Sequence, residues 1–198
     1  YFYLTRLSSP DEDGLLAITA SVMNLAVIFS DMGTGAAIVQ RQNITLNFYN
    51  IVYKLNVIVG FFIMCLIFLS TPIVVGYFER PELYNLFFLL ALVFPITAFG
   101  IVHKAKLEKE QKFKKLAKIE IFCSIMGILI AVILANVGAG VYSIITQTIF
   151  FSLFTTILYK ITSKLHLMFF FFFYKSAIMH VYNFRGNLLL SNLVIYFV

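Results

Sequence analysis

The chain has 198 residues, of which 61% are hydrophobic and only 12% are charged, and its formal net charge is +6. Ordinary soluble domains are about 45–50% apolar and about 25% charged, and a chain this short cannot enclose so much apolar surface in one core. The composition therefore excludes a typical soluble domain and requires lipid as the solvent. Because the basic residues lie between apolar segments, beside the expected lipid headgroups, we expect no nucleic-acid partner.

Apolar segments long enough to cross a membrane follow one another along the chain. A helix needs about 20 apolar residues to span a hydrocarbon core about 30 Å thick. We predict five spans and the start of a sixth, at residues 14–39, 48–78, 83–102, 119–134, 141–159 and 186–198. The opening residues 1–7 are interpreted as the tail of an earlier span, so that the chain is a fragment. Pro95 is expected to kink the third span.

Basic residues gather in alternate connections between these segments. The segment at 103–118, here called the cationic hinge, carries seven Lys and two Glu and is interpreted as a loop. Counted from the turn at 8–14, the second, fourth and sixth connections lie at 40–47, 103–118 and 160–185 and hold twelve basic residues. The other connections and the opening tail hold two, Arg6 and Arg80. Because Lys and Arg are retained on the cytoplasmic side, the cationic hinge is predicted to lie in the cytoplasm. The aromatic run at 168–174 is expected to lie at the inner membrane surface.

Polar residues within the spans are candidates for function. Ionisable groups inside a membrane are costly and usually face a bundle interior or a water-filled cavity. Two readings of them stay open: a polar pathway between helices, or local pairing of charges and hydrogen bonds between helices. The candidates are Asp31, Lys54, Asn24, Asn56 and Gln147.

Other reactive side chains show no chemical pattern. Cys65 and Cys123 lie inside apolar segments and are predicted to be small buried hydrophobes. His103, His166 and His180 are placed in loops or at helix ends, without the spacing of a metal site. We therefore predict no catalytic residue, no cofactor and no metal, and classify the chain as a non-enzyme.

Several stretches, in order along the chain, resemble one family. They are 4–16 (LTRLSSPDEDGLL), 29–41 (FSDMGTGAAIVQR), 79–83 (ERPEL), 99–117 (FGIVHKAKLEKEQKFKKLA) and 138–143 (GAGVYS). Together they resemble the polysaccharide transporter family, the lipid-linked oligosaccharide flippases of the multidrug/oligosaccharidyl-lipid/polysaccharide exporter superfamily.

The resemblance implies an all-α, polytopic membrane helix bundle with two six-helix lobes in the intact protein. Residues 1–162 would form most of the N-terminal lobe, with its first helix truncated. Residues 163–185 would form a cytoplasmic, interfacial connector, and residues 186–198 the start of the second lobe. The expected location is the bacterial cytoplasmic (inner) membrane.

The function implied is translocation of a polyprenyl-diphosphate-linked oligosaccharide by alternating access. A diphosphate is an anion, so Arg41 and Lys54, with Arg185 behind them, are the candidates to bind it. The amides of the candidate set would bond sugar hydroxyls, and Asp31 would exchange a proton or pair with a basic residue. Expected partners are membrane lipids and polysaccharide polymerase enzymes.

Three other functions stay open. An ion-coupled small-molecule or drug antiporter of the same superfamily would share the architecture but favour more acidic residues in the spans than Asp31 alone. A membrane enzyme that handles the same lipid carrier would need large outer loops, and the outer connections here are short. A non-transporting membrane scaffold would be separated from these by a flux assay.

Overall fold

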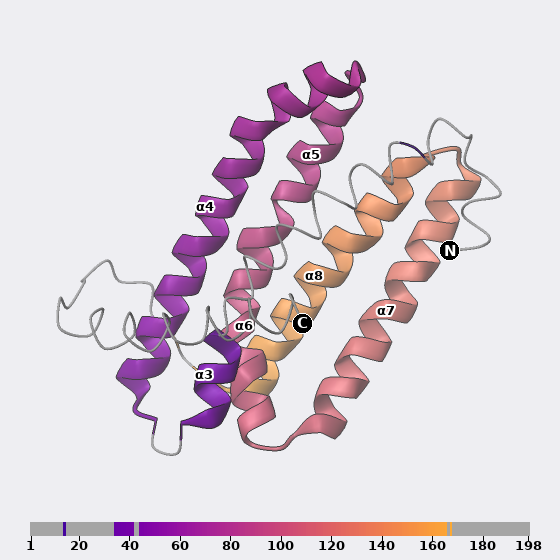
Figure 1. Cartoon of the computed structure of the whole chain (residues 1–198). Coiled ribbons are helices and arrows are strands. Elements are labelled where there is room, and N and C mark those ends of the chain that lie inside the picture. Colours follow the sequence, from indigo (N-terminus) through magenta and orange to yellow (C-terminus); the bar gives the residue numbers. More distant parts are fainter. Residues whose placement is uncertain (1–13, 15–33, 42–43, 166, 168–198) are drawn as a thin grey trace, which may run out of the picture.

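A computed structural model describes residues 14, 34–41, 44–165 and 167 (Figure 1). The elements in this part are α3 (Thr34–Gln40), α4 (Leu46–Phe78), α5 (Leu83–Ala91), α6 (Val93–Lys109), α7 (Phe113–Asn136) and α8 (Val141–Ser163). Four helical stretches are long and apolar enough to cross a membrane: α4, α5 with α6, α7 and α8. The all-α, multi-pass membrane bundle predicted from the sequence is thus confirmed. The predicted span at 14–39, apart from residues 14 and 34–39, and the predicted span at 186–198 lie outside the described residues.

Helix α4 agrees closely with its predicted span. The side chain of Thr45 caps its first turn by accepting from the backbone N–H of Phe48 at 3.4 Å. Pro72 lies inside α4 without ending it. The helix ends at Glu79, whose φ of 54° is left-handed. A left-handed residue stops the helical hydrogen-bond pattern, so the acidic turn at 79–82 follows as predicted.

The third predicted span is divided by the proline within it. α5 ends at Ala91 and α6 begins at Val93. Pro95 has no N–H to offer the carbonyl of Ala91 four residues earlier, and its ring crowds that carbonyl. The helix is therefore interrupted at Leu92, one turn before the proline. Leu92 itself keeps right-handed helical angles, with φ of −64° and ψ of −22°, so the two helices continue as one span.

The cationic hinge is mostly helical, so the prediction of a loop there is wrong. α6 continues to Lys109, α7 begins at Phe113, and only residues 110–112 connect them. Long lysine stems extend along a helix while their ammonium groups reach water, so charge density does not end a helix. The left-handed Gln111, with φ of 53°, makes the reversal.

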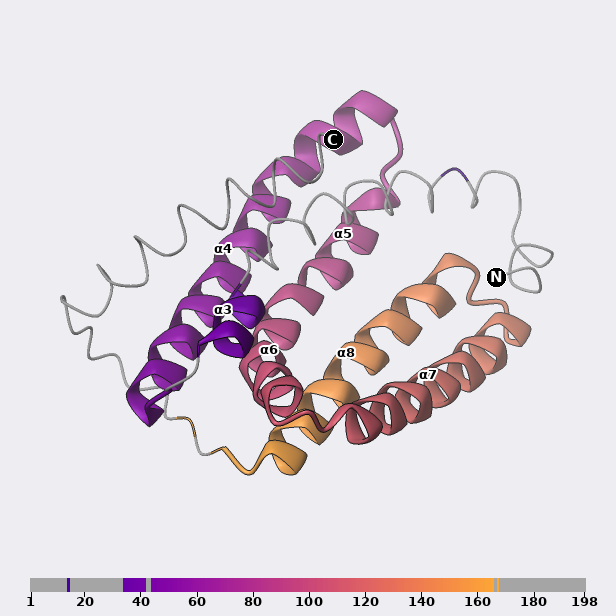
Figure 2. The ribbon, with the colours of Figure 1, turned by 60° about the horizontal axis from the view of Figure 1, so that its bottom comes forward.

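The stretch of α5 and α6 is the centre of the described bundle. In its most apolar part 61% of the residues are buried, compared with 28% in α4, 22% in α7 and 28% in α8. α6 packs against α4 on one side and α8 on the other, and α7 packs against α8 (Figure 2).

Two glycines allow these close contacts. A Cβ on Gly60 of α4 would lie 2.7 Å from the Cβ of Ala98, and one on Gly100 would lie 2.7 Å from Oγ1 of Thr156. Small residues let backbones approach in membranes, where packing drives helix association.

Candidate functional site

Basic side chains of the described helices gather at one end of the bundle, here called the basic end. It comprises the end of α3, the start of α4, the α6–α7 turn and the end of α8 (Figure 1). Its basic residues are Arg41, Lys104, Lys106, Lys109, Lys112, Lys114, Lys115, Lys118, Lys160 and Lys164. In the described turns at the opposite end, 79–82 and 137–140, Arg80 is the one basic residue. The predicted separation of charge holds for this part of the chain.

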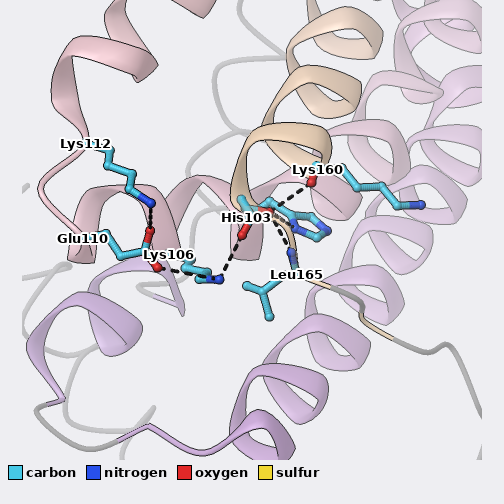
Figure 3. A network of polar contacts seen from close by, with 7 residues as sticks. His103, Lys106, Glu110, Lys112, Lys160 and Leu165 are labelled. Carbon is cyan, nitrogen blue, oxygen red and sulfur yellow. Dashed lines mark hydrogen bonds and ion pairs between the residues drawn. The ribbon is translucent and has the colours of Figure 1, made fainter.

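A buried polar node joins α6 to the end of α8. Nδ1 of His103 lies 2.8 Å from Oγ of Ser163, and the ammonium of Lys106 donates to the Ser163 carbonyl at 2.9 Å (Figure 3). His103 is only 1% exposed, and its ring meets that of Tyr53 edge-on at 6.2 Å between centroids. The prediction that this histidine lies in a loop or at a helix end is wrong. It is a packing and hydrogen-bonding residue inside α6.

The short α6–α7 turn is held by its own charges. Glu110 pairs with Lys112 at 2.5 Å and with Lys106 at 3.6 Å. The hydrogen bond from Lys112, with the charges of both lysines, lowers the pKa of Glu110 below its usual value although partial burial opposes the shift. Glu110 is therefore ionised at neutral pH, and its two pairs persist until acid protonates it.

Two further lysines of the hinge tie helices together. Lys109 donates to the backbone carbonyls of Ile38, at 3.3 Å, and of Arg41, which fastens the end of α3 to α6. Lys104 pairs with Glu120 of α7 at 3.1 Å. The same carboxylate accepts a hydrogen bond from the hydroxyl of Tyr159 at 2.7 Å, so that α6, α7 and α8 meet at one group.

Two of the predicted site residues lie near the basic end. Arg41 is exposed directly after α3, and its guanidinium carbon lies 4.7 Å from the centre of the Phe48 ring. Lys54 is half-buried on α4, eight residues after Leu46. The Phe48 ring restrains the exposed guanidinium, and the hydrogen bond from Lys109 holds the Arg41 backbone carbonyl, so the guanidinium can present several donors to an anion.

The predicted amides are more deeply packed. Asn56 is 2% exposed on α4. Gln147 is half-buried in the first two turns of α8, towards the end opposite the basic end. Its Cγ would lie 3.3 Å from a Cβ on Gly127, so it packs between α7 and α8. The structure thus does not bring Gln147 to the end that holds Arg41 and Lys54. Asp31, Asn24 and Arg185 lie outside the described residues, as does the segment at 168–174.

Sequence reasoning missed the residues that join the helices at the basic end. Glu120 was available as an ionisable residue inside a predicted span, a feature that usually marks a buried partner. Tyr159, Ser163 and His103 gave no comparable signal, because ordinary helix ends contain the same residue types. Cys123 is buried as predicted, whereas Cys65 is exposed on α4 and the prediction for it is wrong.

Known proteins resemble the chain over most of its length. It is 36% identical to the teichuronic acid biosynthesis protein TuaB of Bacillus subtilis (strain 168) over 102 residues, 52% of this chain and 21% of that protein. It is 29% identical to the lipopolysaccharide biosynthesis protein WzxC of Escherichia coli (strain K12) over 67% of this chain and 27% of that protein. The succinoglycan biosynthesis transport protein ExoT of Rhizobium meliloti (strain 1021) is 25% identical over 73% of this chain and 29% of its own length.

The chain thus spans between 21% and 29% of the length of these relatives. No solved structure matches it. The family model described as polysaccharide biosynthesis protein matches residues 3–198, which is nearly the whole chain. The resemblance to polysaccharide transporters is therefore confirmed, and the chain belongs to the polysaccharide biosynthesis protein family.

Proposed function

We propose that the intact protein is a flippase that moves a polyprenyl-diphosphate-linked oligosaccharide across the bacterial cytoplasmic membrane by alternating access. The observation that carries the proposal is the basic end of a multi-pass bundle in this family. A polyprenyl chain requires a lipid-facing route, and a diphosphate requires cations where it enters. The protein supplies both without forming or breaking a bond, so it acts as a transporter and not as an enzyme.

Arg41 and Lys54 form the proposed entry for the diphosphate. The exposed guanidinium of Arg41 suits bidentate contact with phosphoryl oxygens. Lys54 lies about 12 Å further along α4 than its first residue, at 1.5 Å per residue. A diphosphate that first meets Arg41 at the membrane surface would therefore find the next cation deeper in the membrane. Its charge would be balanced at both depths, which lowers the cost of leaving the headgroup region.

The remaining candidates have secondary parts in this proposal. Asn24 and Asn56 are assigned to sugar hydroxyls, although Asn56 is buried here and would have to become accessible during alternating access. Asp31 is assigned to proton exchange or pairing with a basic residue, and Arg185 to support of the entry. The packing of Gln147 between α7 and α8 favours a structural part for it. Polymerase enzymes that extend the exported oligosaccharide are the proposed partners.

Export by a double variant tests the entry. In the intact protein, Arg41→Ala with Lys54→Ala is expected to reduce polymer export about a hundredfold or more, because two charge-assisted contacts are each worth about 1.5–3 kcal/mol. Membrane insertion is expected to stay normal, since neither side chain is buried in the core. Export is measured as surface polysaccharide in cells that lack the native gene.

A matched control removes two other basic side chains from the same end. Lys160→Ala with Lys164→Ala removes two exposed charges at the end of α8 and is expected to leave export close to normal. Normal export by the Arg41/Lys54 variant would discard the assignment. Equal loss in both double variants would replace a defined entry with a diffuse requirement for charge.

A further inference from the structure

The lysines around the α6–α7 turn fall into two groups. Lys104, Lys106, Lys109 and Lys112 each contact a carboxylate or a backbone carbonyl within the bundle. The other three are exposed and make no hydrogen bond or ion pair with the residues that the structure describes: Lys114, Lys115 and Lys118. We call these three the α7 basic face. The four lysines of the first group stabilise the bundle, whereas the α7 basic face makes no contact that would stabilise the described helices.

The α7 basic face continues the apolar side of its helix that turns away from the bundle. At 100° per residue, Lys114, Lys118 and Lys115 lie within about 100° of arc. Further along α7, three apolar residues lie in the same arc or within about 20° of it, and their side chains are exposed: Ile121 by 60%, Phe122 by 57% and Ile125 by 54%. The buried residues Leu116 and Cys123 lie on the other side of α7, and the buried Ile119 lies between the two sides. No described helix covers these apolar residues. If they face acyl chains in the bilayer, the lysines above them lie at headgroup level on the lipid-facing side.

The electrostatic surroundings of this face favour an anion. The first turn of α7 contains no acidic residue, and its N-cap, Lys112, makes no side-chain capping bond. Cations at a helix N-terminus are disfavoured by the helix dipole. The nearby carboxylates of Glu110 and Glu120 already pair with Lys106, Lys112 and Lys104. The three lysines therefore lack compensation from these two acids.

We propose that the α7 basic face binds the headgroup phosphates of anionic phospholipids in the cytoplasmic leaflet. A phospholipid fits both parts of the surface, because its phosphate meets the lysines while its acyl chains cover Ile121, Phe122 and Ile125. A free phosphate would leave the apolar part unused. The site differs from the proposed substrate entry, which lies on the α3–α4 side of the bundle.

Lipid preference of the intact protein tests this site. The protein is reconstituted into nanodiscs of phosphatidylcholine with a minority of phosphatidylglycerol, and the lipids retained are measured by native mass spectrometry. Lys114→Gln with Lys115→Gln and Lys118→Gln is expected to lower the preference for phosphatidylglycerol about a hundredfold, from about 1 kcal/mol for each of the three basic residues near an anionic surface. The corresponding triple Arg variant, which keeps the charges, is expected to retain the preference.

The control at the end of α8 decides whether the site is local. Lys160→Gln with Lys164→Gln is expected to leave the preference unchanged. The proposal is overturned if the triple Gln variant, inserted and monodisperse, keeps the wild-type preference, or if the α8 control loses as much. It is also overturned if the wild type retains a polyprenyl diphosphate in preference to phosphatidylglycerol and the triple Gln variant loses that retention, because the face would then be a substrate site.

Discussion

Gly60→Leu is expected to destabilise the intact protein by about 3 kcal/mol, because α4 and α6 touch at this position. A Cβ there would meet the Cβ of Ala98 at 2.7 Å, the carbonyl oxygen of Phe94 at 3.0 Å and Cα of Pro95 at 3.2 Å. Two of these atoms belong to the backbone and cannot rotate away. The helices must separate, and each loses contacts that lipid replaces only in part. The measurement is the free energy of unfolding in bicelles, with the variant compared to the wild type.

The same helix offers a matched control. A Cβ on Gly76 has nothing within 4 Å, and Gly76 is exposed. Gly76→Leu is therefore expected to change the free energy of unfolding by less than about 0.5 kcal/mol. If Gly60→Leu lowers the free energy of unfolding no more than Gly76→Leu does, α4 and α6 do not pack closely at Gly60.

His103→Ala is expected to cost about 3 kcal/mol, the sum of a cavity and a lost hydrogen bond. The imidazole is 1% exposed and lies between the hydroxyl of Ser163 and the ring of Tyr53. Its removal loosens α6 from the end of α8, so the fall in stability is expected together with a wider α6–α8 distance at the basic end. Spin labels on these two helices would measure that distance.

A second variant separates the two contributions. His103→Phe restores most of the ring volume but cannot bond to Ser163, so it is expected to recover part of the stability and remain about 1 kcal/mol below the wild type. Wild-type stability of both His103 variants would show that the polar node does not hold α6 to α8.

Local signals in the sequence account for much of the fold. The span containing α4 could be predicted closely because hydrophobic length and the turn at Glu79–Glu82 agree. Pro95 predicted a distortion, and the missing N–H explains why it falls at Leu92. The helical structure of the cationic hinge could not be predicted from such local signals. Its lysines satisfy the positive-inside rule equally well from a loop or from two helix ends, so only the tertiary fold decides.

The candidate site was partly predictable for a similar reason. The asymmetry of charge places Arg41 and Lys54 near one end without knowledge of the packing. Whether Gln147 packs between helices depends on which face of α8 contacts α7, and no local sequence pattern specifies that contact. His103 and Ser163 are 60 residues apart, and their hydrogen bond exists only because α6 and α8 pack together.

A bundle that crosses the membrane with its basic end in the cytoplasm is the basis of both proposals. Single cysteines at Glu82 and at Gln111, in the intact protein without Cys65 and Cys123, test this with a membrane-impermeant maleimide applied to spheroplasts. Both positions are exposed, and they lie in turns at opposite ends of the bundle. The cysteine at position 82 is predicted to be labelled at once, and the one at position 111 only after permeabilisation. Labelling of both from outside, or the reverse order, would contradict the account.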